Sequence, residues 1–348
     1  MKEKTKALHK SVAPYTTANN KKSYIQLANT LLPLILLWGL SYASLQVSVW
    51  LTVLFSIIGA GFVVRTFIIF HDCTHGSFFH NKRKNDFIGT VTGIITLFPY
   101  EKWKREHAIH HASSSNLDKR GIGDIWIMTI DEYVEASKWQ RFCYRFYRNP
   151  LVMFGLGPLY LMLVANRINR SDARPKEKRN TYITNIAILL LYSLMIYFMG
   201  WKAFLLVEGV MMYVAAALGI WLFYIQHTFE DSYFEEDSEW HYVKAAVEGS
   251  SYYELPRWLQ WLTGNIGFHH VHHLAPRIPN YHLEEAHNTT PPLHQATTIN
   301  LWMSLDSLKY RLYDPKNMQF VRFRDVKALL RKKSTLVKYE KMKQEKLS

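Results

Sequence analysis

Histidine is the residue type whose spacing points most directly to chemistry, since 16 of the 348 residues are histidine and half of these fall into three short groups. The groups follow the patterns HxxxH, HxxHH and HxxHH, and their members are His71 and His75, then His107, His110 and His111, then His269, His272 and His273. Positions three and four apart share one face of a helix, so the imidazoles of each group can reach one metal ion. Surface histidines would not repeat this spacing, and protonated imidazoles so close together would repel one another. The three groups therefore predict a metal centre.

A ninth candidate ligand follows the last long apolar stretch of the sequence. This residue is His227, within the segment QHTFED at 226–231. Nine imidazoles are too many for one ion, but they suit two ions with four or five imidazoles each, which leaves positions open for oxygen or substrate. His270, inside the third group, is an additional histidine whose role the spacing does not define.

The chemistry of the donor set indicates which metal is bound. Imidazole binds zinc, copper, iron and nickel, whereas structural zinc, blue copper and iron–sulfur centres rely on thiolate ligands. Cys73 and Cys143 are the only two cysteines in the sequence. Haem would need only one or two axial histidines. We therefore favour a pair of non-haem irons held by histidine alone.

Acidic residues close to the histidine groups are candidates to orient the ligands. A metal-bound imidazole usually donates its second ring N–H to a carboxylate or a carbonyl. Five acids lie near the groups in the sequence, namely Asp72, Asp118, Asp124, Glu230 and Asp231. Each could equally be a solvated loop acid, so the sequence leaves both interpretations open.

Two long apolar stretches must position these groups. Residues 23–70 contain one charged side chain, Arg65, and residues 181–227 contain two, Lys202 and Glu208. A continuous helix of either length would be about twice the roughly 30 Å thickness of a bilayer core. Each stretch therefore predicts a hairpin of two transmembrane helices, and we expect Arg65 and Glu208 to extend toward the membrane interfaces.

Two shorter apolar segments, 87–100 and 151–166, barely reach across a membrane and are expected to be re-entrant or interfacial. The position of the histidines supports this expectation. His71 follows the second span and His227 ends the fourth, so both lie on the same face of the membrane. If segment 87–100 crossed the bilayer, His107 would lie about 30 Å away on the opposite face. Four spans and two short elements that do not cross are the arrangement that assembles one site.

The formal charge of +14 indicates the orientation in the membrane. Lysine and arginine gather in the polar tail at 1–22, in segment 167–179 and near the C-terminus, whereas the turns near Gln46 and Gly200 carry few charges. The positive-inside rule then places both termini in the cytoplasm. We expect the tail at 1–22 to be loosely ordered.

The fold class predicted is an all-α integral membrane protein with a helical cytoplasmic cap that carries a histidine-rich di-iron site. The cap comprises residues 71–180, with the first two histidine groups, and residues 228–348, with the third group and a basic C-terminal tail.

Longer phrases around the histidines resemble the membrane fatty acid desaturases, and the acyl-lipid desaturases in particular. These phrases are HDCTHGSFF, HHASSSNLDKRGIGDIW, YIQHTFEDSYFE and GNIGFHHVHHLAPRIPNY, and the resemblance extends over most of the chain to about Phe320. It implies two non-haem irons on the nine histidines named above, O2 as co-substrate and location in a bacterial cell membrane. It also implies that a cis double bond is inserted at the Δ5 position of saturated acyl chains of membrane phospholipids, with a role in cold adaptation.

The electrons for such a reaction must come from another protein, since the sequence shows no iron–sulfur cysteine set and no GxGxxG nucleotide fingerprint. A ferredoxin or a flavodoxin could dock on the basic cap. The same charges could instead contact anionic lipid.

Other functions fit the sequence less well. A related di-iron membrane hydroxylase or a carotenoid-modifying oxygenase would share the histidine groups and remains the alternative. A metal transporter would carry its ligands inside the spans, whereas these groups flank them. A nucleic-acid-binding protein is disfavoured because the sequence contains no recognised binding module.

Overall fold

Four helical segments are long and apolar enough to cross a membrane in the computed structural model, which describes residues 2–326 and 328. They are α2 (Asn20–Ser44), α3 (Val49–His75), α9 (Pro175–Met199) and the continuous run of α10 (Trp201–Phe204), η4 (Leu205–Gly209) and α11 (Val210–His227). Segments of 25 to 27 residues are about 40 Å long as helices, which exceeds the bilayer core. The four predicted spans are therefore present as helices of sufficient length.

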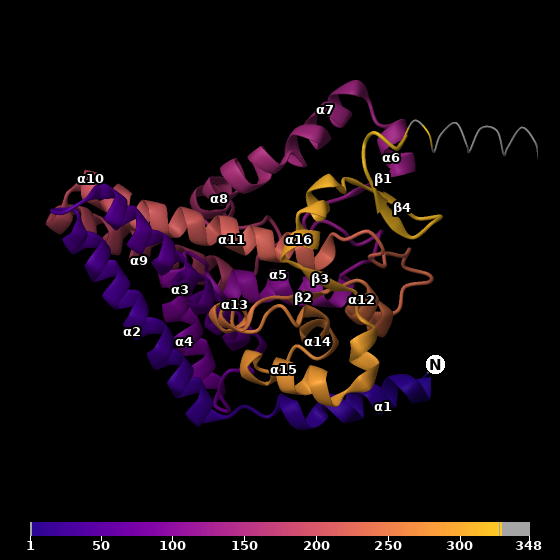
Figure 1. Cartoon of the computed structure of the whole chain (residues 1–348), viewed down its shortest axis with the longest axis horizontal. Helices are drawn as coiled ribbons and strands as arrows, with labels where there is room; N and C mark the ends of the chain where they lie inside the picture. The colour runs from indigo at the N-terminus through magenta and orange to yellow at the C-terminus, as the bar shows by residue number, and fades with distance from the viewer. Residues whose placement is uncertain (1, 327, 329–348) are drawn as a thin grey trace, which may run out of the picture.

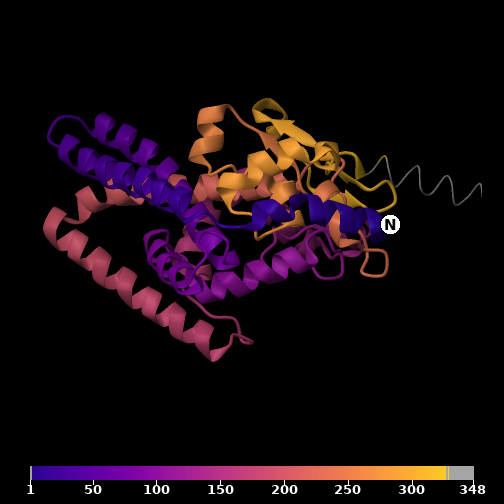
Figure 2. The same cartoon turned by 90° about the horizontal axis from the view of Figure 1, so that it is seen from below.

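The first two spans form a hairpin with contacts along their length, whereas the second two contact each other near their turn, where the centres of the Tyr192 and Phe204 rings lie 4.9 Å apart. Helix α11 lies along α3, where Met211 and Ala215 join the core that contains Ala60 and Val64. Helix α9 instead packs its first turns against α4 and α5, and it diverges from α11 (Figures 1 and 2). Only 6% of its apolar window is buried. The second pair of spans is splayed beyond its turn because α11 packs along α3. The second hairpin therefore stays a prediction.

Glu208 does not extend to an interface as the sequence suggests, but instead ties the spans together. Its carboxylate accepts hydrogen bonds from Trp38 Nε1 at 3.2 Å and from the Tyr192 hydroxyl at 3.0 Å. These partners belong to α2 and α9. An acidic group in a membrane requires such partners, since unpaired burial is costly.

Helices α4 (Lys82–Ile95) and α5 (Tyr100–Ser113) bring the first HxxHH motif, at 107–111, back to the end of α3. Helix α4 has 14 residues and is therefore about 21 Å long, which is too short to cross the bilayer core. It packs closely on α3 and α5 because Gly89 lacks a side chain: a Cβ there would lie 2.2 Å from the Tyr100 ring and 3.0 Å from Cys73 Cβ. This turn of the chain places α5 beside α3.

A second apolar element is bent rather than straight. Helix α7 (Lys138–Tyr147) is followed by a helical run formed by η2 (Val152–Leu156), α8 (Gly157–Tyr160) and η3 (Leu161–Ala165), and the two parts meet at 59°. Together they are apolar enough to be a broken span or a re-entrant loop. The second part lies against α11, and α7 projects away from it (Figure 1).

The remaining elements form a cap at the ends of α3 and α11 (Figure 1). The helices are α6 (Ile130–Glu135), α12 (Tyr242–Glu248), α13 (Arg257–Leu262), α14 (His269–Leu274), α15 (Asn280–Thr289) and α16 (Leu301–Ser304), with 3-10 turns η5 (Pro291–Gln295) and η6 (Asp306–Lys309). The strands are β1 (Met128–Thr129), β2 (Tyr252–Glu254), β3 (Thr298–Asn300), β4 (Leu312–Asp314) and β5 (Gln319–Val321).

Two small sheets correct the all-α prediction, although the chain is mostly helical. Strand β4 pairs in parallel with β1 and antiparallel with β5, and β2 pairs in parallel with β3. Strands of two or three residues leave no periodic pattern in a sequence, so they could not be recognised there.

The N-terminal segment is folded onto the cap, and the prediction of a loosely ordered tail is wrong. It forms α1 (Lys2–Val12) and η1 (Ala13–Thr16). Val12 is buried in a core cluster, and the Tyr15 hydroxyl lies 2.8 Å from Thr289 Oγ1 on α15. Leu8, Val12 and Tyr15 pack in this cluster, but so few apolar side chains among many polar ones gave too weak a signal. The basic C-terminal tail predicted from the sequence lies almost entirely outside the described residues.

Candidate metal centre

Helices α3, α5, α11 and α14 deliver all nine predicted ligands to two adjacent clusters. From here on, these two clusters in space, and not the sequence motifs, are called the first and second histidine groups. The first histidine group contains His71, His75, His107, His111 and His272, and the second histidine group contains His110, His227, His269 and His273. Within each group the candidate ligand atoms all lie within 4.8 Å of one another, which is close enough to hold a metal ion.

Each HxxHH motif divides its members between the two groups. On α5, His107 and His111 belong to the first group and His110 to the second. On α14 the i and i+4 residues, His269 and His273, belong to the second group, and His272 belongs to the first. The HxxxH motif stays within one group, whereas each HxxHH motif contributes to both. Successive helical residues are rotated by about 100°, so positions i+3 and i+4 point in clearly different directions.

The ring nitrogens of the first histidine group lie as far apart as ligands of one ion would. His272 Nε2 is 3.0 Å from His71 Nε2 and 2.9 Å from His111 Nε2, and His111 Nε2 is 3.0 Å from His107 Nε2. Two nitrogens bound at right angles at about 2.1 Å from a metal would be about 3.0 Å apart. His75 Nε2 is buried and has no hydrogen-bond partner among the described residues. A buried polar atom without a partner is rare, and a bound metal would supply that partner.

The second histidine group has the same spacing. His273 Nε2 lies 3.3 Å from His110 Nε2 and 3.1 Å from His269 Nε2, and His269 Nε2 lies 3.0 Å from His227 Nε2. Four nitrogens that converge at these separations can all direct a lone pair at a common centre. Both groups therefore fit a metal.

Three hydrogen bonds on the outer side of the rings fix the direction of the ligand lone pairs. His71 Nδ1 donates to Asp72 Oδ1 at 3.0 Å, and His110 Nδ1 donates to the carboxylate of Asp124. His227 Nδ1 donates to the backbone carbonyl of Gly249 at 3.1 Å. A neutral imidazole carries one N–H, so each of these rings presents an unprotonated Nε2 to its group. The Gly249 carbonyl was missed by sequence reasoning because a backbone acceptor has no residue-type signal.

Asp72 is itself held in place. Its Oδ2 accepts hydrogen bonds from the backbone N–H of Asn280 at 2.7 Å and from Asn280 Nδ2 at 2.8 Å. This links α15 to the first histidine group. Asn280 is a second supporting residue that no spacing in the sequence indicated.

The other three candidate acids fit the alternative left open by the sequence, that of a solvated loop acid. Asp118, Glu230 and Asp231 are exposed. Asp118 Oδ2 accepts from the Asp237 N–H at 2.8 Å, and Glu230 Oε2 accepts from the Tyr310 hydroxyl at 2.8 Å. Across residues 2–326 none of the three hydrogen-bonds to one of the nine histidines. They follow the ends of helices, where the loop turns their side chains toward solvent.

Burial sets the protonation state of the clustered histidines. It holds the pKa of His107, His111, His269, His272 and His273 well below the usual range for histidine, and the neighbouring imidazoles lower these pKa values further. The rings are therefore neutral at pH 7, and a neutral imidazole is the form that binds a metal.

His270 points away from both histidine groups. Its Nε2 lies 2.9 Å from His287 Nδ1, so one of the two rings donates an N–H to the other. This hydrogen bond joins α14 to α15. Burial lowers the pKa of His270 to about 3 and that of His287 to about 4. His270 therefore contributes to the packing of the helix that carries the ligands.

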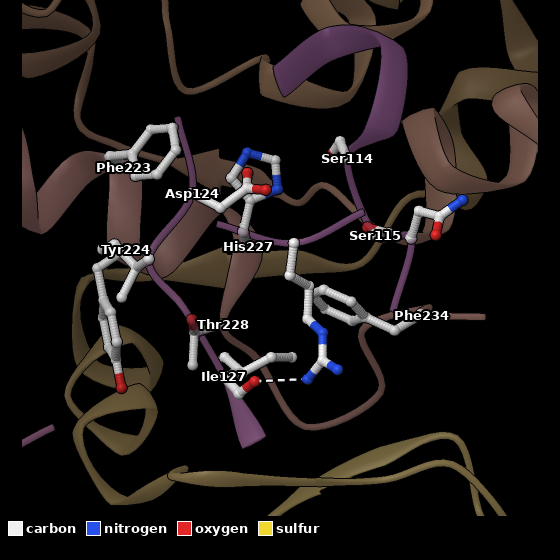
Figure 3. A pocket seen from close by; sticks show the side chains of 12 residues that line it. Ser114, Ser115, Asp124, Ile127, Phe223, Tyr224, His227, Thr228 and Phe234 are labelled. Carbon is white, nitrogen blue, oxygen red and sulfur yellow. Dashed lines mark hydrogen bonds between the residues drawn. The ribbon is translucent and has the colours of Figure 1, made fainter. Parts of the chain in front are cut away.

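A narrow pocket reaches the second histidine group. Asp124 and His227 line it together with Ile127, Phe223 and Phe234 (Figure 3). Its accessible volume of ≈ 20 Å³ is about that of one water molecule. The pocket is too small for an acyl chain, but it brings a small molecule next to the second group.

Fold and site together define a membrane protein of mostly helical structure with two histidine groups that could each hold a metal. The family model for "Fatty acid desaturase" matches residues 48–302, a range that includes all nine histidines. The chain belongs to the fatty acid desaturase family, and it is an oxidoreductase.

Curated relatives extend the comparison. The chain is 56% identical over 324 residues to a fatty acid desaturase of Bacillus subtilis, an alignment that covers 93% of this chain and 92% of the relative. It is 26% identical to the sn-1 oleoyl-lipid 12-desaturase of Synechocystis, over 72% of this chain and 73% of the relative. The sn-1 acyl-lipid omega-3 desaturase (ferredoxin) of the same organism is 27% identical over 65% of this chain and 64% of its own length.

Proposed function

We propose that this protein is an acyl-lipid desaturase that inserts a cis double bond at the Δ5 position of saturated acyl chains in membrane phospholipids. The observation that carries the proposal is the pair of all-histidine groups at the ends of membrane-length helices. Two non-haem irons would be held by the nine histidines of these groups. A role in cold adaptation belongs to the same proposal.

The reaction removes two hydrogen atoms from adjacent methylene groups. Together with two electrons and two protons from outside, these reduce O2 to two molecules of water. Irons held by the nine histidines would supply an oxidant strong enough for an unactivated C–H bond, which no side chain can provide. Asp72, Asp124 and the Gly249 carbonyl keep His71, His110 and His227 in the tautomer that binds metal. Buried surroundings exclude water from the second group, apart from the narrow pocket.

The electron donor is proposed to be a ferredoxin or a flavodoxin. The name of one relative includes ferredoxin, and the excess of lysine and arginine favours a small acidic carrier. Both termini and the two histidine groups would lie on the cytoplasmic side of a bacterial cell membrane, as the distribution of lysine and arginine favours.

The bent element 138–165 is proposed to be embedded in one face of the membrane without crossing it. On α7 the side chains of Trp139, Phe142 and Phe146 are exposed by more than half. The polar side of this helix faces the protein, where Arg141 Nε donates to the Ala136 carbonyl at 2.8 Å. An apolar side turned outward beside a polar side turned inward is typical of a helix that lies in the membrane interface.

A chemical analysis of products tests the proposal. The protein is expressed in a bacterial host without Δ5-unsaturated lipids, and derivatised fatty acids are examined by gas chromatography–mass spectrometry. A new cis double bond at C5 is expected in phospholipid chains. A hydroxylated chain or a modified carotenoid would instead favour the related di-iron hydroxylase or oxygenase.

Substitution of a ligand separates chemistry from folding. His110→Ala should abolish product formation and lower the iron content of purified membranes, while the amount of inserted protein stays the same. His80→Ala, at an exposed histidine outside both groups, is the matched control. Activity and full iron content in the His110→Ala protein would disprove the metal assignment.

A further inference from the structure

Arg65 is a buried cation in a membrane-length helix and has no acidic partner among the described residues. Only 5% of its surface is exposed. Its Nε donates to Thr30 Oγ1 on α2 at 3.0 Å, and its guanidinium carbon lies 3.9 Å from the centre of the Trp261 ring. The sequence suggests that Arg65 extends freely to the interface, but the structure holds it against α13.

This arrangement leaves most of the donors of Arg65 unused. A guanidinium carries five N–H donors, and only the one on Nε is hydrogen-bonded in the described part of the chain. The two Nη atoms are not fully enclosed, since neither is among the buried atoms without a partner. A charged group in a membrane is costly and usually marks a functional site with a partner of opposite charge.

The surroundings of Arg65 have the composition of a membrane interface. Trp258 is 66% exposed and Trp261 is 42% exposed, and tryptophan is enriched at the level of lipid head groups. Arg257 is exposed and lies four residues before Trp261, so it shares one face of α13 with that ring. Helix α13 packs against α3 near the junction of the long helices with the cap (Figure 1).

We propose that Arg65, Arg257 and Trp261 form a binding site for the phosphate of a membrane phospholipid. Arginine can donate two parallel hydrogen bonds to phosphate oxygens, and stacking on Trp261 holds the guanidinium in a fixed orientation. The exposed indole rings favour a lipid over a free anion, because they bind the interfacial part of the same molecule.

The location of the site deepens the proposed function, on which this part of the inference rests. Arg65 precedes His71 by six residues, which is about 9 Å along α3. A saturated chain has no polar group near the reacting carbons, so its anchored end must determine which bond is oxidised. A head group held this close to the first histidine group favours reaction near the carboxyl end of the chain.

Kinetics with two lipids test the site. The purified protein is reconstituted in nanodiscs that contain phosphatidylglycerol or galactosyl diacylglycerol with the same acyl chains. Arg65→Gln should raise the KM for the phospholipid by about tenfold or more, with kcat retained and the kinetics of the phosphate-free lipid unchanged. Arg65→Lys should have a smaller effect because it keeps the charge. Arg179→Gln, at an exposed arginine on α9, should change neither the KM nor the kcat for either lipid.

Each other outcome overturns the inference. An equal loss of kcat with both lipids would show that Arg65 only holds α13 in place. Equal use of both lipids by the unmodified protein would show that no phosphate is recognised.

A binding measurement keeps the two proposals separate. Native mass spectrometry should find phosphatidylglycerol retained by the unmodified protein and lost from Arg65→Gln, whether or not any product forms. If the unmodified protein has its full iron content and forms no product, but retains phosphatidylglycerol that Arg65→Gln loses, the desaturase proposal is refuted and the phosphate site is not. Displacement of the lipid by excess inorganic phosphate would assign the site to the free anion.

Discussion

At the scale of single residues, the HxxHH motif connects the two histidine groups. Because His107 and His111 serve one group and His110 the other, one turn of α5 fixes the distance between the two proposed metals. Helix α14 does the same from the opposite side. A shift of either helix would therefore disturb both groups together, which gives the residues that hold these helices a direct influence on the site.

Asp124 and Asp118 offer a matched pair of substitutions at this scale. Asp124→Asn weakens the acceptor that orients His110 and should lower metal affinity by about 10- to 100-fold. Asp118→Asn should leave the affinity unchanged, because Asp118 is exposed and bonded to Asp237. Iron content after dialysis against graded chelator measures the difference. Equal affinities in the two variants would contradict the role given to Asp124.

The partial burial of His287, with His294 nearby, predicts a dependence of stability on pH. The pKa of His287 is about 4 in the folded protein, below the ordinary histidine value of about 6.5, so the unfolded chain binds more protons between these values. The stabilisation is complete above pH 6.5 and decreases as the pH falls toward 4. The melting temperature of metal-free protein should drop over this range.

The contribution of His287 is isolated by substitution. Between pH 6.5 and 4, the melting temperature of His287→Asn should decrease less than that of the unmodified protein. The control His80→Asn, at an exposed histidine, should show the same decrease as the unmodified protein. A decrease of the same size in all three proteins would show that the titration of His287 does not contribute to this loss of stability.

At the scale of elements, α7 makes a prediction that needs no substitution. Cys143 is exposed and lies on the apolar side of α7 with Trp139 and Phe146, whereas Cys73 is buried. A polarity-sensitive fluorophore on Cys143 should emit at shorter wavelength in lipid nanodiscs than in detergent-free amphipol, and lipids with nitroxide-labelled chains should quench it. Emission typical of water and an absence of quenching would contradict a membrane location for α7.

The elements also show which parts of the structure the sequence could predict. Composition reveals spans such as α2 and α3, since a run of apolar residues has few alternatives. Composition could not reveal that α9 diverges from α11, because both helices are apolar on all sides. The contacts of Met211 and Ala215 with α3 determine where α11 packs. The histidine spacing indicated eight of the nine residues that gather in the site, and the end of the last apolar stretch indicated His227. Neither signal could show their division into groups, which depends on the relative rotation of α5 and α14.

At the scale of the whole molecule, the described termini lie toward the cap (Figure 1), and both histidine groups lie at the ends of α3 and α11 that meet the cap. Alkaline phosphatase inserted near Gln46 or Gly200 should be active in a bacterial host, since this enzyme requires export. A fluorescent protein fused to the N-terminus should be fluorescent, because it folds in the cytoplasm. The reverse pattern would invert the proposed orientation.

The contact between His71 and His272 joins residues that are 201 positions apart in the chain. At about 5–20 residues per second, a ribosome needs about 10 to 40 s to synthesise this interval. During that time the ligands on α3 are already in the membrane without their partners from α14. A metal held by the whole first histidine group could therefore be bound only after α14 had been synthesised and had packed beside α3 and α5.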